Sequence, residues 1–164
     1  MIKLIVLDVD GCLSDGKLIY SADGVESKNF NVKDGLGITT WIKIGNEVAI
    51  ITGRKSDIVA CRANELGVKH LHQGIRNKEK VLRELVSSLD LQFYEVGIIG
   101  DDLNDYNMLS IAGRSFAPKN AANEIRNLVD SVLSVDGGDG AVREMIDILV
   151  DENDQKEEFL SVWI

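Results

Sequence analysis

The sequence contains few cysteines, few prolines and fewer basic than acidic residues. Only two of its 164 residues are cysteine, so no disulfide framework can support the fold, and a chain of this length buries enough apolar surface without one. One proline against 15 glycines indicates a compact chain with many tight loops. Lysine and arginine number 18 against 27 acidic residues, and the resulting net charge of -9 argues against nucleic acid or an anionic membrane as the main partner.

Long hydrophobic runs are also missing. The apolar run at residues 2–7 is too short for a membrane span or a signal peptide, and it meets acidic residues at once. We therefore expect no membrane association and, with so little cysteine, a reducing, cytoplasmic location. The acidic composition still allows a small anionic substrate, provided that a metal ion or a local group of basic residues neutralises its charge.

Three short apolar runs with β-branched members predict strands that are buried on both faces, at residues 2–7, 48–51 and 96–99. Each run stops at a polar cluster that contains glycine: DVDG, TGR or GDD. Helical patterns lie between them, over residues 36–44, 56–66, 77–89, 104–111 and 141–149. This alternation predicts an α/β fold, a Rossmann-like three-layer sandwich whose parallel sheet is covered by helices.

Residues 17–31 interrupt the alternation. Two short β-like pieces surround Asp23-Gly24, a dipeptide that favours a hairpin turn, so we predict a small inserted β-hairpin and no cap domain. We expect one domain over residues 1–150 and a C-terminal tail over residues 151–164. The acidic start of this tail is expected to fray, whereas its last six residues, FLSVWI, are unusually apolar for a free end.

Carboxylates follow the first and the third of the apolar runs. Asp8 and Asp10 point the same way on an extended backbone, and two carboxylates held together favour a hard cation such as Mg²⁺ between them. Asp101, Asp102 and Asp105 follow the third run. Ligands bind at the carboxyl ends of parallel strands, so we expect these acids to converge. For Asp102 and Asp105 the alternative is that they are helix-start acids favoured by the helix dipole.

Thr52 and Lys78 follow two further strands, predicted at residues 48–51 and 70–72. A hydroxyl, an ammonium ion and the free N–H groups of a helix start are what a phosphoryl group needs, and Gly53 lets the backbone approach a ligand. A lone threonine at a strand end is usually structural, and a lone lysine is usually solvated. Their position at the predicted strand ends makes them candidates.

The order DxDG, TG, lysine and GDDxxD resembles that of the haloacid dehalogenase-like phosphohydrolases. The resemblance implies that Asp8 is a nucleophile that accepts the phosphoryl group as an aspartyl-phosphate. It implies that Asp10 is the general acid for the leaving alkoxide and then the base that activates water, and that Thr52 and Lys78 hold phosphoryl oxygens. The implied Mg²⁺ ligands are Asp8, the backbone carbonyl of Asp10 and Asp101, with Asp102 and Asp105 behind them.

A closer resemblance, to the 3-deoxy-D-manno-octulosonate 8-phosphate (KDO 8-phosphate) phosphatases, is carried by DVDGxLSDGxLxY, FNVKDGLGI, ITGRKSDIVACRANELGV, HQGIRNK, GDDLND and GGDGAVRE. It spans residue 1 to about residue 149. It implies a phosphoric monoester hydrolase acting on an eight-carbon acid sugar in lipopolysaccharide precursor synthesis. It also implies a homotetramer in which hairpins from four subunits meet. The implied substrate contacts are Asp10, Asn31, Val32, Lys33, Asp34, Gly35, Thr39, Gly53, Arg54, Arg62 and Lys78.

Some features leave the substrate open. Cys12 stands where an aliphatic residue is expected, Asp139 stands where many relatives are basic, and the ending FLSVWI differs from the family's usual tail. The runner-up substrate is a nine-carbon acid sugar 9-phosphate, and Arg62 could equally be a solvated helix residue. A non-catalytic receiver-like module also gathers acids, a threonine and a lysine. It accepts its phosphoryl group on an aspartate after a middle strand, however, where this chain has Thr52.

Overall fold

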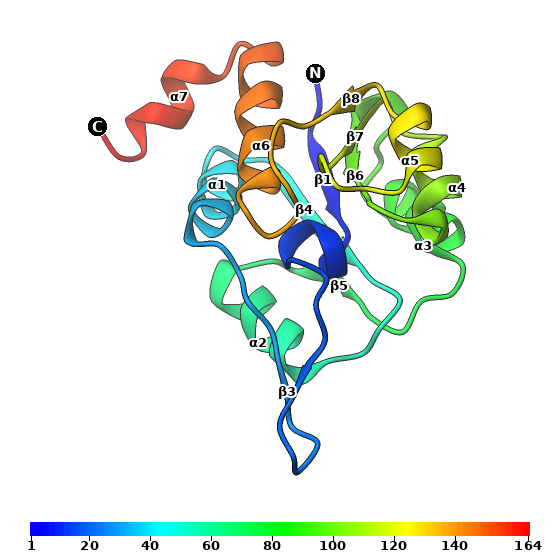
Figure 1. Cartoon of the computed structure of the whole chain (residues 1–164). Coiled ribbons are helices and arrows are strands. Elements are labelled where there is room, and N and C mark those ends of the chain that lie inside the picture. The colour runs from blue at the N-terminus through cyan, green and yellow to red at the C-terminus, as the bar shows by residue number, and fades with distance from the viewer.

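The computed structural model describes residues 1–164, and its centre is a six-stranded parallel sheet with the spatial order β5-β4-β1-β6-β7-β8 (Figure 1). Its strands are β1 (Leu4–Leu7), β4 (Glu47–Ile51), β5 (His70–His72), β6 (Val96–Ile99), β7 (Arg114–Ala117) and β8 (Ser131–Val132). This order is that of a doubly wound fold, in which the direction of winding reverses beside the first strand. The reversal falls between β1 and β6, so their carboxyl ends flank the natural position for a ligand.

Two hydrophobic cores lie on opposite faces of the sheet. Ile5 and Leu7 of β1 pack into the larger core, and Leu4 and Val6 pack into the smaller one, because successive strand side chains point to opposite faces. The helices of the first face are α1 (Val32–Lys43), α2 (Asp57–Leu66) and α6 (Ala141–Glu152), and those of the second are α3 (Lys78–Ser88), α4 (Tyr106–Leu109) and α5 (Asn123–Leu128) (Figure 1). The predicted three-layer sandwich is confirmed. None of the helices combines the length and apolar character that a membrane crossing needs.

Capping contacts explain where several helices begin and end. The Asn77 side chain accepts a hydrogen bond from the Lys80 N–H (3.0 Å) at the start of α3, and Gly67 ends α2 with a φ of 74°. The Asn31 side chain accepts from the Lys33 N–H (2.9 Å). This cap starts α1 at Val32, earlier than the predicted residue 36.

The predicted hairpin consists of β2 (Ile19–Tyr20) and β3 (Glu26–Ser27), joined by a turn in which Gly24 has a φ of 84°. It projects from the body of the molecule (Figure 1). Leu18, Tyr20 and Val25 are more than half exposed. Nothing in this chain covers these apolar side chains.

The end of the chain is more ordered than predicted. α6 continues to Glu152, and α7 (Lys156–Ser161) follows it. Phe159 is buried in the larger core, and the Trp163 indole N–H donates to Thr40 Oγ1 in α1 (2.8 Å). The apolar ending therefore packs against the domain, and residues 151–158 do not fray as expected.

Candidate active site

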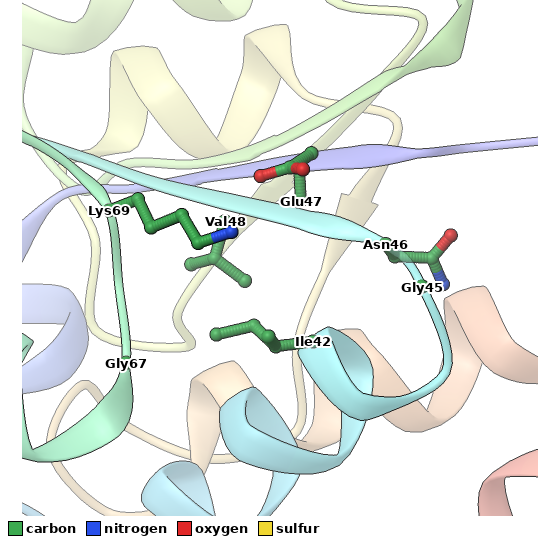
Figure 2. Close-up of a pocket in the computed structure, with 7 residues that line it drawn as sticks. All are labelled: Ile42, Gly45, Asn46, Glu47, Val48, Gly67 and Lys69. Carbon is green, nitrogen blue, oxygen red and sulfur yellow. The ribbon is translucent and has the colours of Figure 1, made fainter.

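Two hollows are candidate sites, one at the amino end of β4 and one at the carboxyl ends of the strands. One, of about 190 Å³, is lined by residues from the end of α1, the start of β4 and the segment after α2 (Figure 2). Its charged lining residues are Glu47 and Lys69, and it contains none of the residues that the sequence predicts to be functional. The other, of about 350 Å³, lies at the carboxyl ends of the strands and is called the crevice below. Its lining residues are Asp8, Asp10, Gly16, Leu18, Thr52, Gly53, Arg54, Asp101, Asp102 and Asn104.

A buried lysine bridges two carboxylates beside the crevice. Lys78 Nζ lies 2.6 Å from Oδ1 of Asp8, the residue that follows β1 in the chain. It also lies 2.6 Å from Oδ1 of Asp105. Burial lowers the pKa of Lys78, but the two carboxylates outweigh this effect and hold its pKa above the usual value. Lys78 is the first residue of α3, so the start of this helix places a fixed positive charge between the two carboxylates.

Asp105 shapes the turn after β6. Its Oδ2 accepts hydrogen bonds from the N–H groups of Asp101 (3.0 Å) and Asp102 (3.3 Å). A Cβ on Gly100 would lie 2.6 Å from the Asp105 Cβ, so glycine is needed there. Asp105 is thus both a helix-start acid and the residue that ties Lys78 to the Asp101 turn, whereas Asp102 is exposed and accepts from the Leu103 N–H (2.8 Å).

Three possible metal ligands gather at this turn. One ligand atom each of Asp8, Cys12 and Asp101 lies within 4.8 Å of the others. Burial, with the Asp105 carboxylate adding to it, raises the pKa of Asp8 to about 8 and that of Asp101 to about 7. Burial also raises the pKa of the Cys12 thiol, which leaves the two carboxylates as ligands for a hard cation.

Gly11 allows Asp101 to approach the turn after β1. This turn, η1 (Val9–Leu13), bends at Gly11, whose φ is 98°. A Cβ at Gly11 would lie 2.0 Å from Asp101 Oδ2. Because no other residue offers both this backbone conformation and this space, the glycine of DVDG brings the carboxylates after β1 and β6 together.

The GGDG segment forms a wall behind the same turn. The Gly138 N–H donates to the Cys12 carbonyl (2.9 Å), and a Cβ on Gly137 would lie 1.7 Å from the Gly11 carbonyl oxygen. Asp139, the departure noted in the sequence, is exposed and lines a different hollow with Lys33.

The sequence reasoning missed two residues of the hairpin that contact side chains lining the crevice. Lys28 Nζ lies 2.5 Å from Asp10 Oδ1 and 3.4 Å from Glu26 Oε1. Glu26 also accepts a hydrogen bond from Arg54 (2.7 Å), which follows β4. Glu26 and Lys28 alternate along the predicted second strand of the hairpin, so they share one face. That alternation was the available signal.

The predicted substrate contacts fall into two groups. Asp10, Gly53 and Arg54 line the crevice and Lys78 lies beside it, but the remainder line no part of it in this chain: Asn31, Val32, Lys33, Asp34, Gly35, Thr39 and Arg62. Asp34 is 1% exposed and accepts from the Arg143 N–H (2.8 Å) at the start of α6, so it joins two helices in the interior.

Comparison with known proteins gives a consistent family. Residues 68–146 match a family described as haloacid dehalogenase-like hydrolase. The KDO 8-phosphate phosphatase of Yersinia pestis is 40% identical over 156 residues, which cover 95% of this chain and 83% of that protein. The enzyme of Escherichia coli K12 is 42% identical over 149 residues, covering 91% and 79%.

Solved structures agree with the sequence comparison. The KDO 8-phosphate phosphatase of Moraxella catarrhalis, in complex with magnesium, phosphate and KDO, superimposes with a TM-score of 0.95 at 38% identity, covering 99% of this chain and 94% of that chain. The cobalt-bound enzyme of Haemophilus influenzae gives 0.88 at 39% identity, covering 92% and 88%. Identity at this level over nearly the whole chain, on the same fold, shows that the protein belongs to the KDO 8-phosphate phosphatase family of haloacid dehalogenase-like hydrolases.

Proposed function

We propose that this protein is a Mg²⁺-dependent phosphatase that hydrolyses KDO 8-phosphate to KDO and phosphate, in the cytoplasm, as a step of lipopolysaccharide precursor synthesis. The observation that carries the proposal is the buried Lys78 between Asp8 and Asp105, beside Asp101 at the carboxyl ends of β1 and β6. It is supported by relatives that carry the name of this reaction. One solved relative binds KDO, phosphate and magnesium together.

In the proposed reaction, an Asp8 carboxylate oxygen forms a bond to phosphorus and the bond from phosphorus to the sugar oxygen breaks. Asp10 gives a proton to the departing oxygen. It then takes a proton from the water that attacks the aspartyl-phosphate, which releases phosphate and restores Asp8. Thr52 and Lys78 hold the phosphoryl oxygens, and Lys78 offsets the repulsion between a carboxylate and a phosphate dianion.

The residues of the crevice suit Mg²⁺, with Asp8, the backbone carbonyl of Asp10 and Asp101 as its proposed ligands. The fit is supported by the raised pKa values of Asp8 and Asp101. Burial and neighbouring carboxylates disfavour the ionised forms of these groups, and a cation bound between them would offset that effect. When bound, the ion supplies a charge that neutralises the carboxylates and polarises the phosphoryl oxygens. Asp102 and Asp105 support the ligands without binding the ion themselves, and Asp105 fixes the turn that presents Asp101.

The acid-sugar half of the substrate needs contacts beyond those of one crevice. Arg54 is 39% exposed in its side chain and supplies a positive charge at the crevice wall. The other predicted contacts are Asn31, Val32, Lys33, Asp34, Gly35, Thr39 and Arg62. Of these, Asp34 faces the interior, and the rest would need rearrangement or a second copy of the chain to meet a substrate. We therefore propose a homotetramer with its sites near subunit interfaces.

Phosphate release from a panel of esters tests the proposed function. The panel contains KDO 8-phosphate, a nine-carbon acid sugar 9-phosphate, a hexose 6-phosphate and an aryl phosphate, each with Mg²⁺ and with a chelator. We expect the highest kcat/KM for KDO 8-phosphate, by about tenfold or more, because even one extra or missing methylene changes kcat/KM by about 10–200-fold and a missing hydrogen-bonding group by more. A higher kcat/KM for the nine-carbon ester would transfer the assignment to that substrate. A protein that keeps a phosphoryl group on aspartate without turnover would be a receiver-like module.

A further inference from the structure

The Asp10 carboxylate has one hydrogen-bond donor within the chain. Lys28 Nζ lies 2.5 Å from Asp10 Oδ1, whereas Asp10 Oδ2 has no hydrogen bond from any residue of the chain. The Asp10 side chain is 22% exposed and lines the crevice. Lys28 comes from the hairpin, 18 residues further along the chain. Through this contact the hairpin holds the carboxylate of a residue that lines the crevice.

Lys28 is held too firmly to be an incidental surface ion pair. Its side chain is 1% exposed, and its ammonium group has a second acidic partner in Glu26. Glu26 is fixed in turn by Arg54, which also donates to the Tyr20 hydroxyl (3.1 Å). A buried lysine stem with a doubly paired ammonium group has few alternative conformations. The network thus joins both strands of the hairpin, the loop after β4 and the turn after β1.

We propose that Lys28 is a positioning residue for the chemical step, and that the hairpin through Lys28 completes the acid–base apparatus of the crevice. The inference rests on the proposed function, in which Asp10 transfers protons to the leaving oxygen and from water. Lys28 holds Oδ1 of the Asp10 carboxylate and leaves its Oδ2 free to transfer protons. Without this contact the carboxylate turns about its side-chain bonds and spends less time in the productive geometry.

Single-turnover kinetics with two leaving groups test the role of Lys28. The variants are Lys28→Met, Lys28→Arg and, as a matched control, Lys17→Met, whose side chain is 77% exposed at the base of the same hairpin. We expect Lys28→Met to slow phosphoryl transfer from a sugar phosphate by about 10–100-fold, which is at most the lower limit of the ~10²–10⁴-fold that general acid catalysis contributes, because the variant still has the Asp10 carboxylate. Transfer from p-nitrophenyl phosphate should change by less than about threefold, because its leaving group needs little protonation. Lys28→Arg should recover most of the rate, and Lys17→Met should behave as the wild type.

A double variant separates positioning from a general structural role. If Lys28 acts through Asp10, then Lys28→Met adds no further loss in an Asp10→Asn background. An equal loss with both esters, or losses that multiply in the double variant, would overturn the inference. If Lys28→Met does not fold, Lys28→Gln takes its place, with the melting temperature as the check.

A crystal structure of Lys28→Met makes the inference independent of turnover. We expect the Asp10 carboxylate to move or to occupy more than one rotamer. An unmoved, singly ordered Asp10 would contradict the positioning role even if the enzyme proved active. Conversely, a wild-type protein that hydrolyses neither ester would refute the proposed function, whereas the position of Asp10 in the variant would still decide the structural claim.

Discussion

Among single residues, Asp8 combines two proposed roles that an amide cannot fill, because it is both nucleophile and metal ligand. We expect Asp8→Asn to abolish turnover of KDO 8-phosphate and to leave the fold intact. Asparagine has the same shape, its oxygen can still accept from Lys78, and Lys78 keeps Asp105 as a partner. Steady-state assays and circular dichroism measure the two outcomes, with the remote Asp90→Asn as the control. A variant that keeps about a tenth of the wild-type rate would remove Asp8 from the nucleophile role.

The acids of the crevice also predict how stability depends on pH and metal. Burial raises the pKa of Asp8 to about 8 and that of Asp101 to about 7, so the folded, metal-free protein binds protons that the unfolded chain has already released. Its free energy of unfolding should therefore fall as the pH rises toward 8. Mg²⁺ binds the folded, ionised site, so its stabilising effect should grow over the same range.

Melting temperatures in chelator and in Mg²⁺, measured from about pH 6.5 to about pH 8, test this dependence. Burial also raises the pKa of Asp34, to about 6, which adds a similar slope at lower pH and is why the range starts above it. The variant Asp101→Asn should flatten the slope in chelator. A metal-free melting temperature that rises with pH, or a Mg²⁺ effect that does not change, would contradict the expectation.

At the scale of elements, the contact between the GGDG segment and the turn after β1 leaves no room for a side chain. We expect Gly137→Ala to lower the free energy of unfolding by about 1–3 kcal/mol, the range for overpacked interiors, and to reduce turnover because η1 must shift. The added Cβ would lie 1.7 Å from the Gly11 carbonyl oxygen. Chemical denaturation and the phosphatase assay measure the two effects.

Gly45→Ala is the matched control for this prediction. A Cβ there meets no atom within 4 Å, although its φ of 90° strains any other residue. We expect a loss of about 1 kcal/mol from backbone strain and unchanged activity. If Gly137→Ala and Gly45→Ala behaved alike, the wall behind η1 would have no bearing on the reaction.

The central elements of the fold could be predicted because their sequence signals are strong and local. β1, β4 and β6 are continuous apolar runs, and α2 and α3 carry capping residues at their ends. β7 reads RSFA and β8 has two residues, so neither shows an apolar run, and both were missed. The edge of the sheet depends on pairing with β6, and that contact is not visible in a local pattern.

The site divides in the same way. Asp8, Asp10, Thr52 and Asp101 could be predicted from position, because the ends of parallel strands meet at one edge. Lys28 could not, since its contact with Asp10 depends on where the hairpin lies relative to the turn after β1. The contacts at residues 31–35 came from resemblance alone, and in this chain they begin α1 instead of lining the crevice.

At the scale of the whole molecule, the exposed hairpin predicts assembly. Leu18, Tyr20 and Val25 are more than half exposed on a two-stranded element that would be marginal alone in water. We expect light scattering at micromolar concentration to give four times the chain mass of 18.0 kDa. Val25→Asp should dissociate this assembly and reduce selectivity for the acid sugar over simple phosphate esters.

The outcome that would contradict shared sites is an 18.0 kDa species with full activity. A Val25→Asp variant that is monomeric yet keeps its selectivity would do the same. Lys17→Met changes an exposed residue of the same hairpin but leaves its apolar side chains in place, so it should leave the assembly intact.

The packing of Gly137 and Gly138 on the turn after β1 also sets the order in which the site can form during synthesis. A ribosome that has released the chain as far as Asp105 has delivered every side chain proposed for the chemistry. In that unfinished chain, the turn that carries Asp8, the proposed nucleophile, still lacks the hydrogen bond to the Cys12 carbonyl and the wall behind Gly11. The segment that supplies both emerges only after β8, in the last fifth of the chain. A chain terminated before this segment would therefore contain all the side chains proposed for the chemistry, but the turn that holds Asp8 would lack its packing partner.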